Sequence, residues 1–431
     1  MGTVERTTCC VVGGGPAGMV LGLLLARAGV EVTVLEKHAD FLRDFRGDTV
    51  HPTTLDLLDE LGLGERFDAL PQSRMEEVAF PVGEVGEGES LVVGDFRRLA
   101  GRCVRWTAHP YVAMVPQWDL LDLLADAAEA EPTFTLRRST EVTDLRRDAA
   151  GRVTGVAYRT ADGATGELAA DLTVACDGRG SKARAQAGLQ VVDFPCPMDA
   201  WWFRLPRRAG EDRPALTPRI GPGRMAVVIP REGYLQVASM SAKGRDAEIR
   251  ARGIEAFRAD VADLAPDLAD RVDALESMDD VKFLDVRLDR LRRWHVDGLL
   301  CIGDAAHAMS PIGGVGINLA VQDAVATATL LAGPLLEGEV TGADLDRVRR
   351  RRLLPTVAVQ TLQRLLHRAI VTPALEGRMA GPPRIVRRIA AAFPPATAVP
   401  AYLIGVGLRP ERAPDFARRS PVTSAAHPPR R

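Results

Sequence analysis

The chain has 431 residues, of which 46% are hydrophobic and 26% are charged, and its formal net charge is −2. This composition is typical of a globular protein with about two or three structural units, and it argues against general nucleic-acid binding, which requires an excess of Lys and Arg. The six cysteines show no CxxC pair and no metal-ligand spacing, which predicts free thiols, no metal site and a cytoplasmic protein.

No signal peptide or transmembrane segment is predicted near the N-terminus. A β-rich run begins almost at the first residue, where a signal peptide would otherwise stand. The apolar stretch over residues 11–26 contains several glycines, is too short to span a membrane and is followed by Arg27.

The first predicted unit is a strand, a helix and a second strand over residues 7–36. Between the first strand and the helix lies the pattern GxGxxG, and the second strand ends in an acid. In such a unit the glycines allow a tight turn, close approach to a pyrophosphate and close helix packing, while the acid binds a ribose. This predicts a dinucleotide site, NAD or FAD, formed by Gly13, Gly15, Pro16, Ala17, Gly18, Glu36 and Lys37.

Two later loops also follow predicted strands. In "DLTVACDGRGSKARAQAG" (171–188) a strand ends at Asp177 and Gly178, and Ser181 can cap the next helix. In "CIGDAAHAMSPIGGVGINLA" (301–320) Asp304 follows a strand, and a glycine-rich turn precedes a predicted helix.

These three motifs, in this order, resemble the group A flavoprotein monooxygenases, the p-hydroxybenzoate hydroxylase-like family. The resemblance spans nearly the whole chain and includes residues 45–63, residues 115–124 and "YLIGVGLRPE" near the C-terminus. It implies an α/β fold with a discontinuous Rossmann-like FAD-binding domain, an inserted mixed β-sheet substrate domain and a C-terminal helical region.

The resemblance also implies roles for particular residues. Asp304 would bond the ribitol chain of FAD, and the glycine-rich turn would stabilise negative charge on the reduced flavin. Asp177 would lie near the pyrophosphate and the path of the nicotinamide cofactor, with a helix cap as its alternative role. For His307 we expect a structural hydrogen bond. The remaining implied FAD contacts are Arg46 (alternatively a surface ion pair), Gln117, Gly178, Gly303, Pro311, Gly313, Gly314, Gly316, Ile317 and Asn318, of which Arg46 and Pro311 are the predicted catalytic residues.

The implied reaction is hydroxylation of an aromatic or polycyclic small molecule. NADPH or NADH would reduce non-covalently bound FAD, and O2 would then give a flavin C4a-hydroperoxide that transfers one oxygen atom. A flavin-dependent oxidase or reductase without oxygen insertion remains an alternative, as does a non-enzymatic flavoprotein. A halogenase is disfavoured because "WWFRLP" does not match a WxWxIP-like signature.

The predicted domains follow from the positions of these motifs. The FAD-binding domain comprises residues 1–75, 101–186 and 282–335, and the substrate domain comprises 76–100 and 187–281. Residues 336–410 form a helical region and 411–431 a disordered tail.

The substrate pocket is predicted on the β-rich runs of the inserted domain. Alternation places Trp201, Phe203 and Leu205 on one face of a strand and Trp202 and Arg204 on the other. We predict Trp201, Phe203 and Gln236 as substrate contacts. The arginine run "RVRRRRLLP" (347–355) is interpreted as a solvated helix face, and the oligomeric state is predicted as monomer or homodimer.

Overall fold

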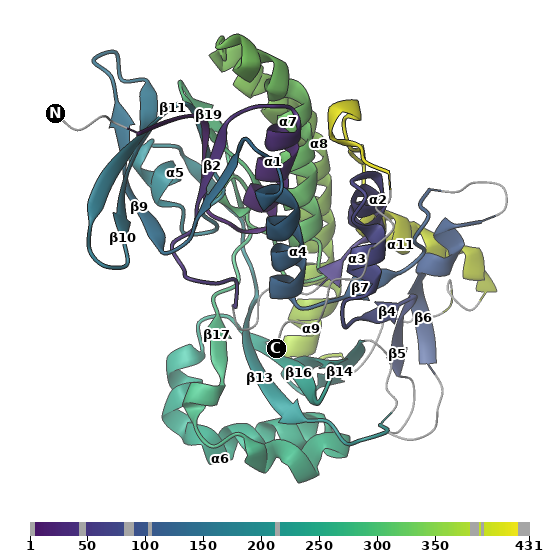
Figure 1. The fold of residues 1–431 in the computed structure, drawn as a ribbon. Helices are drawn as coiled ribbons and strands as arrows, with labels where there is room; N and C mark the ends of the chain where they lie inside the picture. Colours follow the sequence, from purple (N-terminus) through teal and green to yellow (C-terminus); the bar gives the residue numbers. More distant parts are fainter. Residues whose placement is uncertain are drawn as a thin grey trace.

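The computed structural model describes residues 5–42, 49–81, 90–101, 106–211, 216–379, 388 and 392–420, and every structural statement concerns these residues. Figure 1 shows two lobes. The larger lobe contains a mainly parallel sheet and the long helices α1, α4, α7 and α8, and the smaller lobe contains a second sheet covered by α6.

The larger lobe is organised around an 8-stranded sheet whose parallel strands run in the order β20-β11-β1-β2-β8. In the register, Val12 lies opposite Ala175, and Ala175 lies opposite Cys301. The three predicted motifs therefore leave the sheet at the same edge, where ligands bind in open α/β sheets. The strands of this sheet are β1 (Glu5–Val12), β2 (Val32–Leu35), β8 (Phe134–Arg137), β9 (Thr140–Arg147), β10 (Val153–Thr160), β11 (Thr165–Ala175), β19 (His295–Val296) and β20 (Leu299–Cys301).

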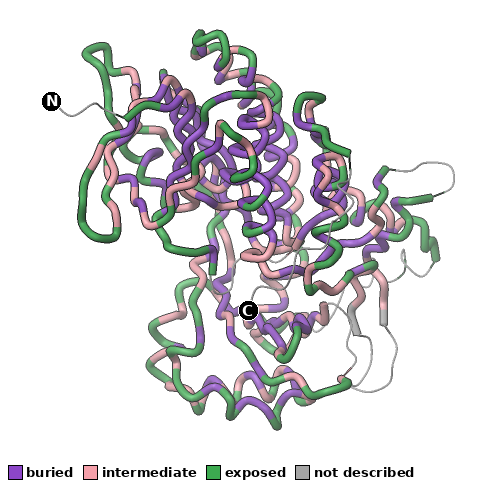
Figure 2. The backbone as a smooth tube through the Cα atoms, viewed as in Figure 1, coloured by how far each residue is buried: buried purple, intermediate pink, exposed green. Residues whose placement is uncertain are grey.

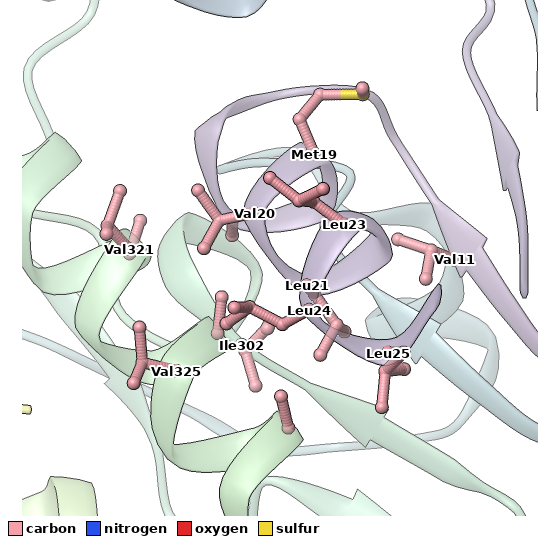
Figure 3. Packing of buried hydrophobic residues seen from close by; sticks show 14 of the residues in the cluster. Val11, Met19, Val20, Leu21, Leu23, Leu24, Leu25, Ile302, Val321 and Val325 are labelled. Atoms are coloured by element: carbon pink, nitrogen blue, oxygen red, sulfur yellow. The ribbon is translucent and has the colours of Figure 1, made fainter. Parts of the chain in front are cut away.

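Helix α1 (Pro16–Arg27) packs against α7 (Gly316–Glu337) in the core of this lobe, where Val20 and Leu24 point toward Val321 and Val325 (Figure 3). Both helices are buried on most sides, as expected of helices that are apolar nearly all round. Among the described helices, α7 alone has the length and composition to cross a membrane, and 72% of its apolar window is buried in the protein. Figure 2 shows this concentration of buried residues.

Shorter elements surround the open edge of the sheet. A three-stranded sheet has the order β3-β7-β4, and β5 and β6 form a separate hairpin. The shorter elements are β3 (Thr49–Val50), β4 (Ser73–Met75), β5 (Glu77–Pro81), β6 (Ser90–Asp95), β7 (Val112–Met114), β12 (Val191–Asp193), β18 (Asp289–Leu291), α2 (Pro52–Glu60), α3 (Gly64–Asp68), α5 (Lys182–Gln186), α9 (Thr372–Leu375) and α11 (Ala398–Gly405). The remaining long helices of this lobe are α4 (Gln117–Glu129) and α8 (Gly342–Leu366).

The smaller lobe is a five-stranded sheet with the order β14-β15-β16-β13-β17. Helix α6 (Asp246–Leu264) and a 3-10 helix over 266–274 cover the face that points away from the larger lobe (Figure 1). The strands are β13 (Met198–Pro206), β14 (Thr217–Gly221), β15 (Arg224–Pro230), β16 (Tyr234–Ala242) and β17 (Lys282–Leu284). Because β17 belongs to this sheet, the predicted boundary at residue 282 falls a few residues too early.

The C-terminal segment differs from its prediction. The expected disordered tail over 411–431 is wrong for residues 411–420, where Ala413 and Ala417 are buried in the core of the larger lobe. Arg27 Nη1 donates to the Ala417 carbonyl at 2.8 Å, and the Ala413 N–H donates to Glu60 Oε2 at 2.7 Å. A Pro- and Arg-rich composition suggested disorder, but small side chains and specific partners anchor these residues. Residues 421–431 lie outside the described part of the chain.

Candidate active site

The three motifs meet at the edge of the large sheet through direct contacts. A Cβ atom on Gly13 would lie 2.7 Å from the Cys176 carbonyl oxygen, so these two loops touch. Arg179 Nε donates to Asp304 Oδ2 at 3.1 Å, which joins the second motif to the third. Arg184, the buried arginine of the second motif, donates to the Ala305 carbonyl at 3.3 Å.

The glycines of the first loop have different structural roles. Gly13 has a φ of +103°, a conformation that only glycine adopts easily. A Cβ on Gly18 would lie 2.0 Å from the Gly13 carbonyl oxygen, so helix α1 can approach the loop only without a side chain. A Cβ on Gly15 would meet nothing within 4 Å. The loop is therefore packed on its inner side and open at Gly15, at the N-terminus of α1.

Glu36, the acidic residue predicted to bind a ribose, contacts the backbone of this loop. Glu36 is buried, with Oε2 accepting the Gly14 N–H at 2.8 Å and Oε1 accepting the His38 N–H at 3.0 Å. Lys37 is exposed beside it.

Asp177 combines a local role with an unused oxygen. Its Oδ2 accepts the Ala183 N–H at 3.3 Å, while Ser181 caps α5 by accepting the Arg184 N–H at 3.0 Å. Burial raises the pKa of the Asp177 carboxyl group. Its Oδ1 atom is buried and has no hydrogen-bond partner in the described part of the chain. A buried acceptor without a partner indicates a missing donor, such as a hydroxyl group of a ligand.

The glycine-rich turn is held from below by the segment that begins at residue 49. The Gly314 N–H donates to the Pro311 carbonyl at 3.0 Å, and Gly313 and Gly314 have φ values of +83° and +63°. Thr49 Oγ1 donates to the Gly314 carbonyl at 2.7 Å, and a Cβ on Gly314 would lie only 2.5 Å from that hydroxyl oxygen. Glycine is thus required here by both conformation and space.

His51 supports the same turn as a neutral imidazole. Its Nε2 lies 3.2 Å from the Gly313 carbonyl oxygen and donates to it. Burial lowers the pKa of His51 to about 4, because a charged ring would lose its hydration. The ring is 1% exposed and therefore acts as a fixed donor.

Helix α7 begins directly after the turn and is tied to α2. Both Thr53 Oγ1 and Thr54 Oγ1 donate to Asn318 Oδ1 at 2.8 Å. A Cβ on Gly316 would meet nothing within 4 Å, so the first turn of α7 is open to a ligand. Its free N–H groups and dipole favour negative charge at this position.

The predicted substrate contacts divide between two faces of the smaller sheet. Trp201 and Phe203 are 1% and 0% exposed and pack against α6, so their prediction as pocket residues is wrong. Trp201 Nε1 donates to Asp246 Oδ1 at 3.1 Å, which turns the indole toward the N-terminus of α6. The predicted alternation itself is confirmed, but only packing decides which face carries α6.

Gln236 lies on the opposite, inner face of the sheet. It pairs with Arg204 on β13 and Ile229 on β15, and its Oε1 accepts from Arg231 Nε at 3.2 Å. The inner face packs against the larger lobe. Ile312, within the glycine-rich turn, joins the cluster that contains Met225 and Met240.

Two further predicted residues are placed less directly. Gln117 is the first residue of α4, shortly after β7, which pairs with the strand of Thr49. Ile317 is 8% exposed at the start of α7. Arg46 lies outside the described residues.

Several residues at the site were not predicted. Thr49, His51 and the threonines of α2 lie in the segment 45–63 that carried the resemblance, but no pattern indicated that they support a turn far away in the sequence. The arginine run was interpreted as a solvated helix face, which is wrong for Arg352. That side chain is 1% exposed and donates from Nε to Asp323 Oδ1 at 3.0 Å.

Comparisons with known proteins agree with this geometry. The family described as FAD binding domain matches residues 6–363. The 6-methylpretetramide 4-monooxygenase of Streptomyces rimosus is 35% identical over 383 residues, covering 85% of this chain and 85% of the relative. The dialkyldecalin synthase of Streptomyces rugosporus is 27% identical over 395 residues, covering 87% of this chain and 77% of the relative.

The solved structure of an anhydrotetracycline hydroxylase from Streptomyces rimosus shares the fold. It has a TM-score of 0.70 at 24% identity and covers 93% of this chain and 76% of that chain. The family match and the 35% identical relative show that this chain belongs to the FAD binding domain family of flavoprotein monooxygenases.

Proposed function

We propose that this flavoprotein monooxygenase uses NADPH or NADH and O2 to hydroxylate a large aromatic or polycyclic compound. The observation that carries the proposal is the meeting of three open features at one sheet edge. These are the loop at Gly15, the unpartnered Oδ1 of Asp177 and the first turn of α7 at Gly316. The monooxygenase relative supports oxygen insertion as the outcome.

The residues present fit FAD. The open N-terminus of α1 would take the pyrophosphate, and Glu36 would accept from the adenosine ribose. Asp304 would accept from the ribitol hydroxyls, and the buried oxygen of Asp177 would accept from a hydroxyl group of the cofactor near the pyrophosphate. The turn over 311–316 would lie against the pyrimidine edge of the flavin.

Bound flavin supplies the electrons that activate O2 for hydroxylation. The chain's own contribution is positional and electrostatic. The first turn of α7 presents N–H groups and a positive dipole end to negative charge on the cofactor. His51 and Thr49 hold that turn rigid through the carbonyl groups of Gly313 and Gly314.

We propose that a bulky apolar substrate binds at the inner face of the smaller sheet. Met198, Met225 and Met240 all belong to the cluster that includes Ile312 of the glycine-rich turn. Methionine side chains adapt to irregular apolar shapes. Gln236 is a polar group on the same face, and we propose that it orients a substrate oxygen.

A second outcome on this fold has a specific precedent among the relatives. One relative is named a dialkyldecalin synthase and not a monooxygenase. A flavin oxidase or reductase also remains open, since pocket residues decide how the reduced flavin reacts. The experiment must therefore trace the oxygen atom itself.

The test uses the purified full chain loaded with FAD. NADPH or NADH, O2 and a panel of polycyclic phenols are supplied, and consumption of nucleotide and O2, hydrogen peroxide and product mass are measured under ¹⁸O2. Hydroxylation consumes one O2 and one NAD(P)H plus a proton per product, inserts one labelled atom and releases the other as water. Hydrogen peroxide equal to the nucleotide consumed, with no labelled product, would support the oxidase instead.

Two variants of β16 sharpen the test of the substrate face. Gln236→Ala on the inner face should raise the KM for a substrate, or the fraction of O2 released as peroxide, about tenfold through loss of one hydrogen bond. Ser239→Ala, on the outer face opposite Trp201, serves as the matched control and should change neither. Equal behaviour of the two variants would place the substrate elsewhere. The cytoplasmic location, and a monomeric or homodimeric state, stay predictions.

A further inference from the structure

A fully buried carboxylate lies behind the turn that presents Asp304. Asp323 on α7 is 0% exposed and accepts three hydrogen bonds. The Gly303 N–H and His307 Nε2 donate to its Oδ2 at 3.1 and 2.6 Å, and Arg352 Nε donates to its Oδ1 at 3.0 Å. Burial alone would raise the pKa of Asp323, but His307 and Arg352 hold it below its usual value. The group is therefore an anion inside the core.

These bonds clamp the turn between β20 and the glycine-rich segment. Gly303 has a φ of +58°, and its carbonyl oxygen accepts the N–H groups of Ala306 and His307 at 2.8 Å. Its own N–H is held by Asp323. Both polar groups of Gly303 are thus fixed, and the next residue in the chain is Asp304.

The same network reaches the C-terminal segment. Arg352 Nη1 donates to Glu411 Oε1 at 3.3 Å and to the Arg409 carbonyl at 3.2 Å. Glu411 is 4% exposed, also binds Arg351, and its N–H donates to Gln322 Oε1 at 2.7 Å. Residues at the end of the described chain are therefore linked by two charged contacts to the turn at Gly303.

We propose that Asp323 is a positioning residue for FAD, and that Arg352 and Glu411 extend this function to the C-terminal segment. Asp323 does not face the ligand. It orients the Gly303 backbone so that the Asp304 carboxylate points to the ribitol hydroxyls. The inference rests on the proposed placement of FAD against Asp304.

A buried network of this kind is suited to positioning rather than to stability. Ion pairs in the core gain little net free energy, because both ions lose their hydration. Their removal nevertheless disturbs everything they orient, since the remaining polar groups must find new partners. The network therefore acts mainly by fixing the geometry of the turn at Gly303.

The experiment is a double-mutant cycle on FAD affinity. Apoprotein variants Asp323→Asn, Asp304→Ala and the double variant are titrated with FAD, and the flavin visible spectrum and midpoint potential are recorded for each complex. We expect Asp323→Asn to raise the FAD Kd ten- to a hundredfold, the range for loss of one charge-assisted hydrogen bond. The double variant should be no weaker than Asp304→Ala alone, because both changes remove the same contact.

Matched variants separate positioning from simple loss of stability. Asp346→Asn removes a partly exposed ion pair of Arg349 on α8 and should leave the FAD Kd, spectrum and potential unchanged. Glu411→Gln should raise the Kd about threefold to tenfold, since the carboxylate at Asp323 remains. If Asp323→Asn fails to fold, Glu411→Gln with Asp304→Ala provides the same cycle.

The outcomes distinguish this inference from the placement on which it rests. An unchanged Kd for Asp304→Ala would contradict the placement of FAD against Asp304. A weakened Asp304→Ala together with an Asp323→Asn protein that binds FAD normally, even if it melts earlier, would overturn the positioning role alone. Fully additive losses in the cycle would also overturn it.

Discussion

In the larger lobe some of the most deeply buried side chains are ionic, whereas in the outer half of the smaller lobe they are aromatic and aliphatic. Asp323 and Arg352 are 0–1% exposed and bind each other, while Trp201 and Phe203 are equally buried against α6. Apolar burial stabilises a fold roughly in proportion to its area, but a buried ion pair contributes mainly orientation. The larger lobe thus places charged groups with fixed hydrogen-bond partners in its interior, whereas the outer core of the smaller lobe contributes stability through apolar packing.

The largest expected effect tests the apolar side of this comparison. Phe203→Ala should lower the free energy of unfolding by about 3–5 kcal/mol, because it leaves a cavity beside Phe257. FAD affinity measured well below the melting temperature should not change. Chemical denaturation and an FAD titration check the two parts, with Phe203→Leu as the milder control. A parallel loss of FAD affinity would show that the outer core also serves the cofactor.

The next effect concerns the pH dependence of stability, to which the neutral imidazole of His51 contributes. The pKa of His51 is about 4 in the folded protein, against an ordinary value of 6.5. As pH falls between these values, the unfolded chain binds a proton that the folded chain does not, so stability is lost on acidification, on the order of 3 kcal/mol. Above pH 6.5 this contribution is fully present.

His51→Gln should remove that part of the pH dependence. Glutamine keeps a donor but does not titrate, so the unfolding free energy of the wild type minus that of the variant should fall steadily from neutral pH to pH 4, by about 3 kcal/mol. Burial also lowers the pKa values of His295 and His367, but both proteins contain them. Parallel stability curves for the two proteins would contradict a buried neutral His51.

A smaller effect contrasts two glycines within one loop. Gly18→Ala should cost about 1–3 kcal/mol of stability, because its Cβ meets the Gly13 carbonyl oxygen and α1 must shift. Gly15→Ala should leave the melting temperature of the apoprotein unchanged but weaken FAD binding, because its Cβ enters open space at the helix N-terminus. Thermal melts of apoprotein and FAD titrations separate the two. Equal effects of both changes would contradict an open cradle at Gly15.

The smallest expected effect concerns alkylation of the buried cysteines, which should not react in the folded protein. Cys9, Cys10 and Cys301 are 0% exposed in the larger lobe, and burial raises the pKa of Cys10 to about 12. These thiols are neither accessible to the reagent nor ionised, so they should resist alkylation at pH 8 until the protein unfolds. Among the cysteines that the structure describes, Cys176 and Cys196 are partly buried, and we expect Cys196 to react before Cys9, Cys10 and Cys301. Peptide mapping by mass spectrometry identifies the positions, and early labelling of Cys301 would show that the larger lobe opens locally.

The loops at the edge of the large sheet were largely predictable because their signals are local. A glycine at a strand end reports a tight turn, and an acid after a strand reports a polar ligand, whatever the rest of the chain does. Gly13, Gly18 and Gly314 accordingly occupy positions where a Cβ would collide with the backbone or with Thr49. The meeting of the three motifs was also predictable, because parallel strands end at one edge of a sheet.

The substrate side was less predictable. Alternation separates two faces of a strand but does not say which face receives a helix, so Trp201 and Phe203 were assigned to the wrong side. For Arg352 and residues 411–420, the composition of the surrounding sequence suggested exposure to solvent. Their burial depends on partners such as Asp323 and Glu60 that are distant in sequence.

The sequence by itself determined the fold, the family and the loops that meet at one edge of the large sheet, because these depend on backbone conformations that particular residues permit. The tertiary structure alone decided which face of the smaller sheet meets the larger lobe, which charges enter the core and how the C-terminal segment reaches the turn at Gly303. The physical reason is that burial and ion pairing are properties of neighbours in space. A single residue type carries the capacity for such contacts but not the identity of its partner.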